Sequence, residues 1–83
     1  MRHATPADLD RLNPLLAELR KLPLRERQRG SFSRGSEAFL HFHADEDDLY
    51  VDVRLGGEFE RRRVSTPEEQ ALLVAEARGA LGI

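Results

Sequence analysis

The chain has 83 residues, no cysteine, no tryptophan and a formal net charge of −2, with 40% hydrophobic residues. Its length leaves room for one small core, so we predict a single domain spanning residues 1–83. Without cysteine, disulfides, cysteine-ligated zinc, iron–sulfur clusters and thiol nucleophiles are excluded. No apolar run approaches the ~20 residues of a membrane span, and the first residues form no hydrophobic signal segment, so we predict a cytoplasmic protein without a membrane partner.

Charge is unevenly distributed along the chain: residues 1–36 carry a net charge of +4 and residues 37–83 a net charge of −6. The positive excess forms a predicted basic patch of Arg25, Arg27, Arg29 and Arg34. The negative excess centres on 45–48. Opposed charges of this kind favour pairing with a second copy or steering of a charged partner. Two solvated loops are the simpler interpretation.

Two segments carry the same helix-start pattern, Thr5-Pro6-Ala7-Asp8 and Thr66-Pro67-Glu68-Glu69. In each, Thr is placed to cap free N–H groups, Pro takes the first helical position and an acid three residues after the cap reaches back. The first helix is expected to kink at Pro14, or to restart there with Asn13 as cap, and to end near Lys21. The predicted buried stripes are Leu9, Leu12, Leu16 and Leu19, flanked by Leu15 and Leu22, in the first helix and Leu73, Val74, Ala77 and Leu81 in the second.

Between these helices the hydrophobic period changes from 3.6 to 2, which is typical of strands with one buried face. Residues 38–44 and 49–55 alternate clearly, residues 58–64 form a further strand and residues 31–34 a short leading one. The acidic tetrapeptide 45–48 and Gly56-Gly57 are predicted turns, the latter a two-residue hairpin. The predicted fold is α+β in the order α-β-β-β-β-α: an antiparallel meander with the N- and C-terminal helices packed on one face.

Because side chains switch faces at every strand residue, the remaining side chains of the two alternating strands are expected to face away from the helices. The predicted binding surface on this open sheet face consists of Phe39, His41, His43, Tyr50, Asp52 and Arg54.

Three hypotheses compete for this face. Cross-strand pairing, or a homodimer or protein partner that covers Phe39 and Tyr50, needs no ligand. Exposed aromatics beside cations also suit single-stranded nucleic acid, although the chain is acidic overall and 45–48 would repel phosphates. His41-Phe42-His43 places two imidazoles on one strand face with carboxylates nearby, so a divalent metal site at His41 and His43 is the third alternative.

Enzymatic chemistry finds little support. No glycine-framed serine accompanies the histidines, and Gly56-Gly57 lacks a phosphate-binding motif. Arg61, Arg62 and Arg63 alternate faces on a strand, so at least one is expected to pair with Glu58, Glu60 or Asp52. We therefore predict a non-catalytic binding domain that self-associates through the open sheet face. No catalytic residue, cofactor or metal ligand is assigned.

The stretch Gly30-Ser31-Phe32-Ser33-Arg34-Gly35-Ser36-Glu37-Ala38-Phe39, followed by Leu49–Arg54 and the Pro67-Glu68-Glu69 helix start, resembles the core of MmcQ/YjbR-like proteins. That resemblance implies a helix, an antiparallel meander and a returning helix, and proteins of this family are proposed to bind DNA. The stretches Leu24–Arg27 and Ala38–His43 are also similar to short bacterial proteins. Only the fold expectation is carried over, because the chain lacks the His-, Asn-, Lys- and Trp-containing tail of the family.

Overall fold

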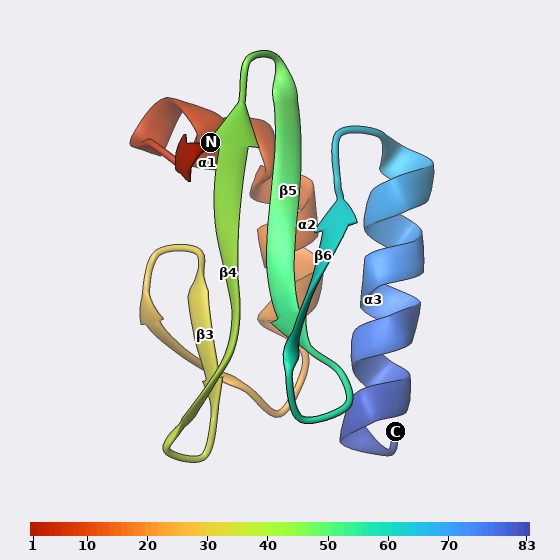
Figure 1. The fold of residues 1–83 in the computed structure, drawn as a ribbon. Helices are drawn as coiled ribbons and strands as arrows, with labels where there is room; N and C mark the ends of the chain where they lie inside the picture. The colour runs from red at the N-terminus through yellow and green to blue at the C-terminus, as the bar shows by residue number, and fades with distance from the viewer.

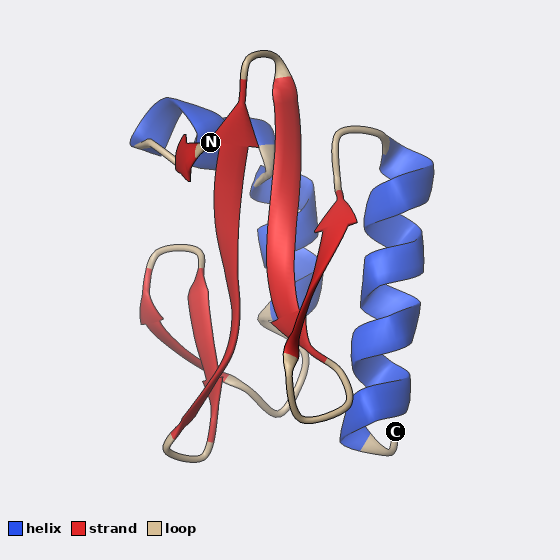
Figure 2. Ribbon diagram, in the orientation of Figure 1, coloured by secondary structure: helices blue, strands red, loops and turns tan.

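A six-stranded antiparallel sheet packs against helices on one face, so the predicted α+β class is confirmed. The computed structural model describes all 83 residues. Its strands are β1 (Arg2–His3), β2 (Arg25–Gln28), β3 (Ser31–Arg34), β4 (Glu37–Asp45), β5 (Asp48–Arg54) and β6 (Phe59–Arg63), and its helices are α1 (Pro6–Arg11), α2 (Asn13–Leu19) and α3 (Pro67–Leu81). Figures 1 and 2 show the meander β2-β3-β4-β5-β6 with α1 and α2 behind β4 and β5, and α3 beside β6. The strand β1 pairs with β4, on the edge that β3 also uses.

Both predicted helix starts are confirmed as capping boxes. The Thr5 hydroxyl accepts a hydrogen bond from the Asp8 N–H while the Asp8 carboxylate accepts one from the Thr5 N–H, and Thr66 and Glu69 repeat the pattern at α3. The break at Pro14 is also confirmed, because α1 ends at Arg11 and α2 begins at Asn13. The predicted Asn13 cap is wrong: its side-chain oxygen instead accepts a hydrogen bond from the Arg29 guanidinium.

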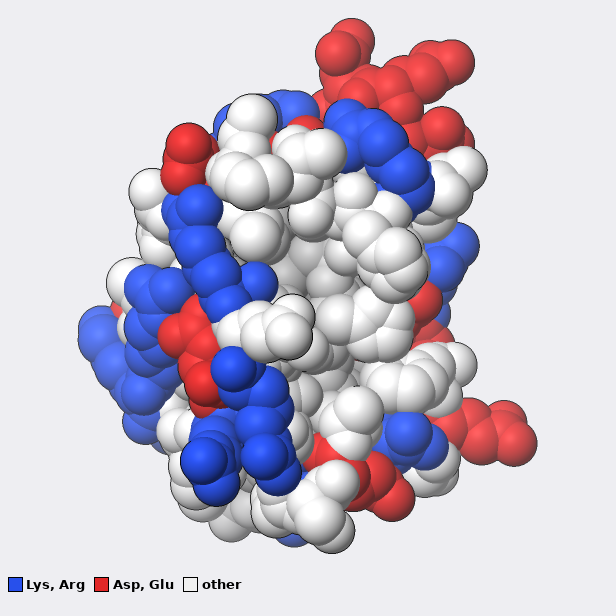
Figure 3. All heavy atoms as spheres, turned by 90° about the vertical axis from the view of Figure 1, so that its left-hand side faces the viewer, with Lys and Arg blue, Asp and Glu red and all other residues white.

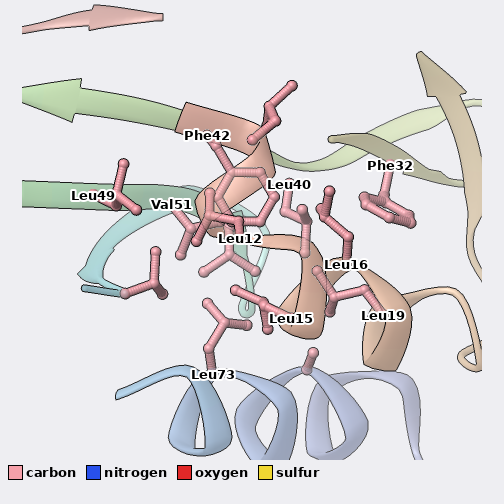
Figure 4. Packing of buried hydrophobic residues seen from close by; sticks show 14 of the residues in the cluster. Leu12, Leu15, Leu16, Leu19, Phe32, Leu40, Phe42, Leu49, Val51 and Leu73 are labelled. Atoms are coloured by element: carbon pink, nitrogen blue, oxygen red, sulfur yellow. The ribbon is translucent and has the colours of Figure 1, made fainter. Parts of the chain in front are cut away.

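The helices and the sheet share one core of 17 buried residues (Figure 4). Leucines of α1 and α2 meet β4 and β5 side chains such as Phe42 and Val51, and Leu73 closes the core from α3. Each such fully buried side chain contributes about 1.5–3 kcal/mol relative to exposure. The helical stripes predicted from the sequence supply much of this core, although Val74 and Leu81 are only partly buried. None of the helices is long and apolar enough to cross a membrane.

Two strands were not predicted. The strand β1 has two residues, and β2 reads Arg-Glu-Arg-Gln, so neither shows an apolar alternation. The sheet edge, where one side of the strand has no neighbour, accepts such a polar segment. The predicted two-residue hairpin at Gly56-Gly57 is also wrong, because Arg54 pairs with Phe59 and leaves a four-residue connection.

The turn between β2 and β3 is pressed against α1. Gly30 adopts a φ of +80°, and a Cβ at this position would lie 2.6 Å from the Leu9 Cδ2. Its N–H donates to the Glu26 carboxylate, which also receives the Arg20 guanidinium. The positive φ therefore favours glycine here, and any larger residue would also have to displace the end of the Leu9 side chain.

Candidate functional site

The two longest strands present a polar row on the sheet face opposite the helices, which we call the open face. The antiparallel register places His41 opposite Asp52 and His43 opposite Tyr50, and these four side chains are all partly buried. Arg54 follows on the same face of β5. Five of the six side chains of the predicted binding surface are thus brought together.

Phe39 is the exception, and its predicted exposure is wrong. Its side chain is 2% exposed and belongs to the hydrophobic core. The cause is a register shift: Phe32 pairs with Leu40 but Ser33 pairs with Ala38, which leaves Phe39 as an extra residue in β4. Such a bulge breaks the strict alternation of faces. The alternation predicted from the sequence therefore holds from Leu40 onward but not before it.

The open face also contains residues that the sequence analysis missed. The strand β1 adds His3, which pairs with His43. The strand β6 adds Phe59 opposite Arg54, Arg61 opposite Asp52 and Arg63 opposite Tyr50. The two polar residues of β1 show no hydrophobic alternation that could have predicted a strand. For β6, the alternation of 58–64 had already indicated that Arg61 and Arg63 share a face.

All three histidines of the chain meet in one cluster. The ring centroid of His43 lies 4.7 Å from that of His3 and 4.9 Å from that of His41, while the His3 and His41 centroids are 6.3 Å apart. The other side of the His41 ring meets Phe59 edge-on at 5.2 Å, and the Arg54 guanidinium lies over the Phe59 ring. His43 is therefore the central imidazole of the cluster.

Asp52 brings a negative charge to the imidazoles. Its Oδ2 lies 3.1 Å from the His43 Nε2 and 3.5 Å from the His41 Nε2. Arg61 donates two hydrogen bonds to the same carboxylate, from Nε at 2.7 Å and from a terminal nitrogen at 2.8 Å. These bonds, with the charges of Arg61 and the neighbouring imidazoles, hold the pKa of Asp52 below its usual value against the opposing effect of burial. The carboxylate is thus ionised at neutral pH and held facing the imidazoles. The expectation that at least one arginine of 61–63 pairs with Glu58, Glu60 or Asp52 is confirmed.

Burial keeps His41 neutral to lower pH than usual. Desolvation is the largest cause of its lowered pKa, and the neighbouring His43 acts in the same direction, while Asp52 opposes both. A neutral imidazole offers a nitrogen lone pair, which is the form that binds metal ions.

The Nε2 of His43 is buried without a hydrogen-bond partner. The Asp52 Oδ2 lies 3.1 Å from this nitrogen, but no hydrogen bond joins the two groups.

The donor atoms of His41, His43 and Asp52 have the spacing of a metal site. One atom from each lies within 4.8 Å of the other two. Two ligands bound at about 2.0–2.1 Å to a tetrahedral zinc ion stand about 3.3 Å apart. The observed separations of 3.1 and 3.5 Å between the Asp52 oxygen and the two Nε2 atoms bracket this value. The donor atoms of the two imidazoles lie within 4.8 Å of each other.

The arginines of the open face, in contrast, are already paired. Arg61 is held by Asp52, Arg63 lies 2.9 Å from an Asp48 oxygen and Arg54 lies 3.4 Å from a Glu37 oxygen. A phosphate group approaching this face would have to displace a carboxylate at each arginine.

The predicted basic patch does not form one free surface. Arg29 is tied to Asp10 and Asn13, Arg27 donates to the Ser33 hydroxyl and Arg34 donates to the Ala80 carbonyl. Arg25 lies in β2 without an ion pair. Figure 3, seen from the side of β2 and β3, shows Lys and Arg gathered beside a hollow of uncharged atoms.

A hollow of about 390 Å³ lies beside the cluster, with His3, Arg29, His41 and Phe42 among its lining residues. It follows the β4 edge used by β1 and β3, whereas Asp52 stands on β5 along the opposite edge. The hollow and the three-residue donor set therefore share His41, whereas Asp52 lies away from the hollow.

Comparison of the chain with protein-family models, curated proteins and solved structures gave no match. The resemblance to MmcQ/YjbR-like proteins stays a prediction.

Proposed function

We propose that this protein is a non-catalytic domain that binds a divalent transition-metal ion on its open face through His41, His43 and Asp52. The observation that carries the proposal is the buried His43 Nε2, which has no hydrogen-bond partner and lies at metal-ligand spacing from the Asp52 carboxylate. A bound cation gives this nitrogen the partner that the protein itself does not supply.

The donor set favours particular ions. Two imidazoles and one carboxylate suit zinc, nickel, cobalt or copper, whereas magnesium and calcium prefer sites made of oxygen ligands. Arg61 donates to the carboxylate and fixes its orientation, as hydrogen-bond partners of metal ligands do in other sites.

Self-association and nucleic-acid binding have weaker support. Self-association is the function that the sequence favoured. The open face that would carry it lacks Phe39, which is buried, but includes Phe59, which is 40% exposed. Nucleic-acid binding needs free cations, and the open-face arginines are engaged by carboxylates. Both stay predictions, and light scattering with and without zinc tests the first of them.

The test is a zinc titration of the purified chain in competition with a chromophoric chelator, followed in parallel through the imidazole nitrogen resonances. We expect one ion per chain and shifted resonances for His41 and His43. His43→Ala and Asp52→Asn are each expected to weaken binding by at least about tenfold, which is the smaller effect seen even when only a hydrogen-bond partner of a ligand is lost.

Tyr50→Phe is the matched control, because Tyr50 lies opposite His43 on the same face but supplies none of the three donor atoms. It should bind zinc like the wild type. Imidazole resonances that do not move with zinc, or equal binding by His43→Ala and Tyr50→Phe, would overturn the proposal.

A further inference from the structure

We propose that His3 is a fourth protein ligand of this ion, so that metal binding fastens the N-terminal strand to the sheet. This inference rests on the proposed function. It adds a fourth protein ligand to the ion, and that ligand comes from a third strand.

The backbone of β1 already places His3 for this role. His3 pairs with His43 and Arg2 with Ala44, and the next residue, Ala4, donates its N–H to the Phe42 carbonyl. Directly opposed residues of an antiparallel pair carry their Cβ atoms about 4.5–5.5 Å apart on the same face. His3 therefore rises from the sheet next to the central imidazole of the cluster.

The strand is also held from its other face. The Arg2 side chain, which points the opposite way from His3, binds the Asp8 carboxylate. That carboxylate is fixed in turn by the N–H and hydroxyl of Thr5 at the start of α1. With its backbone anchored on both sides, His3 has only its side-chain torsions left to adjust.

The ring of His3 is free to make that adjustment. It is exposed and tilts against the His43 ring at 4.7 Å, and it forms no hydrogen bond or ion pair in the structure. Rotation of the side chain carries its nitrogens toward the donor set without any change in the strand. The rotation would change only the contacts of the His3 ring with the His43 and His41 rings.

A fourth donor changes the kind of site. Three protein ligands leave a coordination position for water, as in catalytic zinc sites, whereas structural sites are closed by four. With His3 bound, the ion links β1, β4 and β5 through three imidazoles and one carboxylate. The shortest strand of the sheet is then fastened by the metal as well as by its few backbone hydrogen bonds.

The experiment compares His3→Phe and His3→Ala with the wild type in zinc affinity and in the visible spectrum of the cobalt(II)-loaded protein. His3→Phe keeps a ring to pack on His43 but removes the donor nitrogens, so it separates ligation from packing. We expect both variants to bind zinc at least about tenfold more weakly. We also expect both to change the visible cobalt spectrum, because a water molecule would replace an imidazole in the fourth position.

X-ray absorption of the zinc-loaded wild type counts imidazoles directly and needs no variant to fold: three support the proposal and two overturn it. If wild type binds zinc but His3→Phe matches it in affinity and in cobalt spectrum, His3 is not a ligand and the three-residue site stands. If wild type binds no zinc, the proposed function fails, and this inference fails with it.

Discussion

Phe39 and Leu40 are neighbours in β4, yet both side chains are buried, at 2% and 1% exposure. The bulge that allows this converts Phe39 from a surface residue into part of the core. We expect Phe39→Ala to lower the free energy of unfolding by about 3–5 kcal/mol, as large-to-small changes of buried aromatics do. Phe59→Ala, on the open face at 40% exposure, should cost less than about 1.5 kcal/mol. Urea denaturation of the two variants measures this difference. Equal losses of unfolding free energy would contradict the burial of Phe39 by the bulge.

Gly30 provides a second test of the packing. Gly30→Ala combines a strained positive φ with a clash against Leu9, so we expect a loss of about 2–4 kcal/mol in the free energy of unfolding. Gly35→Ala is the matched control, because Gly35 has a φ of +60° but open space around its Cβ position. Gly35→Ala should lower the free energy of unfolding by only about 1 kcal/mol, which is the cost of a left-handed backbone conformation for alanine. Thermal unfolding of both variants separates steric from conformational strain, and a similar loss in the two would show that Leu9 simply moves aside.

The lowered pKa of His41 makes stability depend on pH. Above the unfolded-state pKa of about 6.5 the imidazole is neutral in both states and has no effect. As pH falls below this value, the unfolded chain takes up the proton more readily than the folded one, so stability falls until the lower folded-state pKa is passed. His41→Gln removes this titration, and urea midpoints from pH 7.5 to 5 should therefore decline less steeply than in the wild type. Urea midpoints that decline equally steeply in His41→Gln and the wild type would show that His41 does not contribute to the pH dependence of stability.

Asp8 connects α1 with β1, and its loss should affect both. Hydrogen bonds from Arg2 and Thr5 hold the pKa of this carboxyl well below its usual range, so its stabilisation is complete above about pH 4 and is lost as pH falls further. At pH 7 we expect Asp8→Asn to cost about 1–3 kcal/mol in the free energy of unfolding. Glu69→Gln is the comparison, because Glu69 fills the same capping position in α3 and its Arg63 partner is more distant, at 3.5 Å. Chemical denaturation should show a smaller loss of unfolding free energy for Glu69→Gln than for Asp8→Asn. A larger loss for Glu69→Gln would show that the Arg2 contact does not stabilise the fold.

The sequence was most informative where a pattern repeats. The two Thr-Pro starts, the leucine stripes and the alternation of β5 are local and periodic, and each predicted element is present. The features that the sequence did not predict depend on contacts between residues that are far apart in the chain. Whether Phe39 is an extra residue in β4 depends on its pairing with β3, and the placement of His3 depends on a two-residue strand that exists only because β4 offers it an edge. His41, His43 and Asp52 could be assigned to one face from alternation, but the distances that make them a donor set follow from the register between β4 and β5.

The Asp8 carboxylate binds the first turn of α1 and the side chain of Arg2 at the same time. The cap of α1 and the anchoring of β1 consequently depend on the same carboxylate. If the proposed metal site forms, a chain whose α1 has unfolded would also release His3, so partly unfolded forms would bind the ion through fewer ligands and more weakly. Occupancy by the metal would then report on the integrity of a helix that contributes no ligand to it.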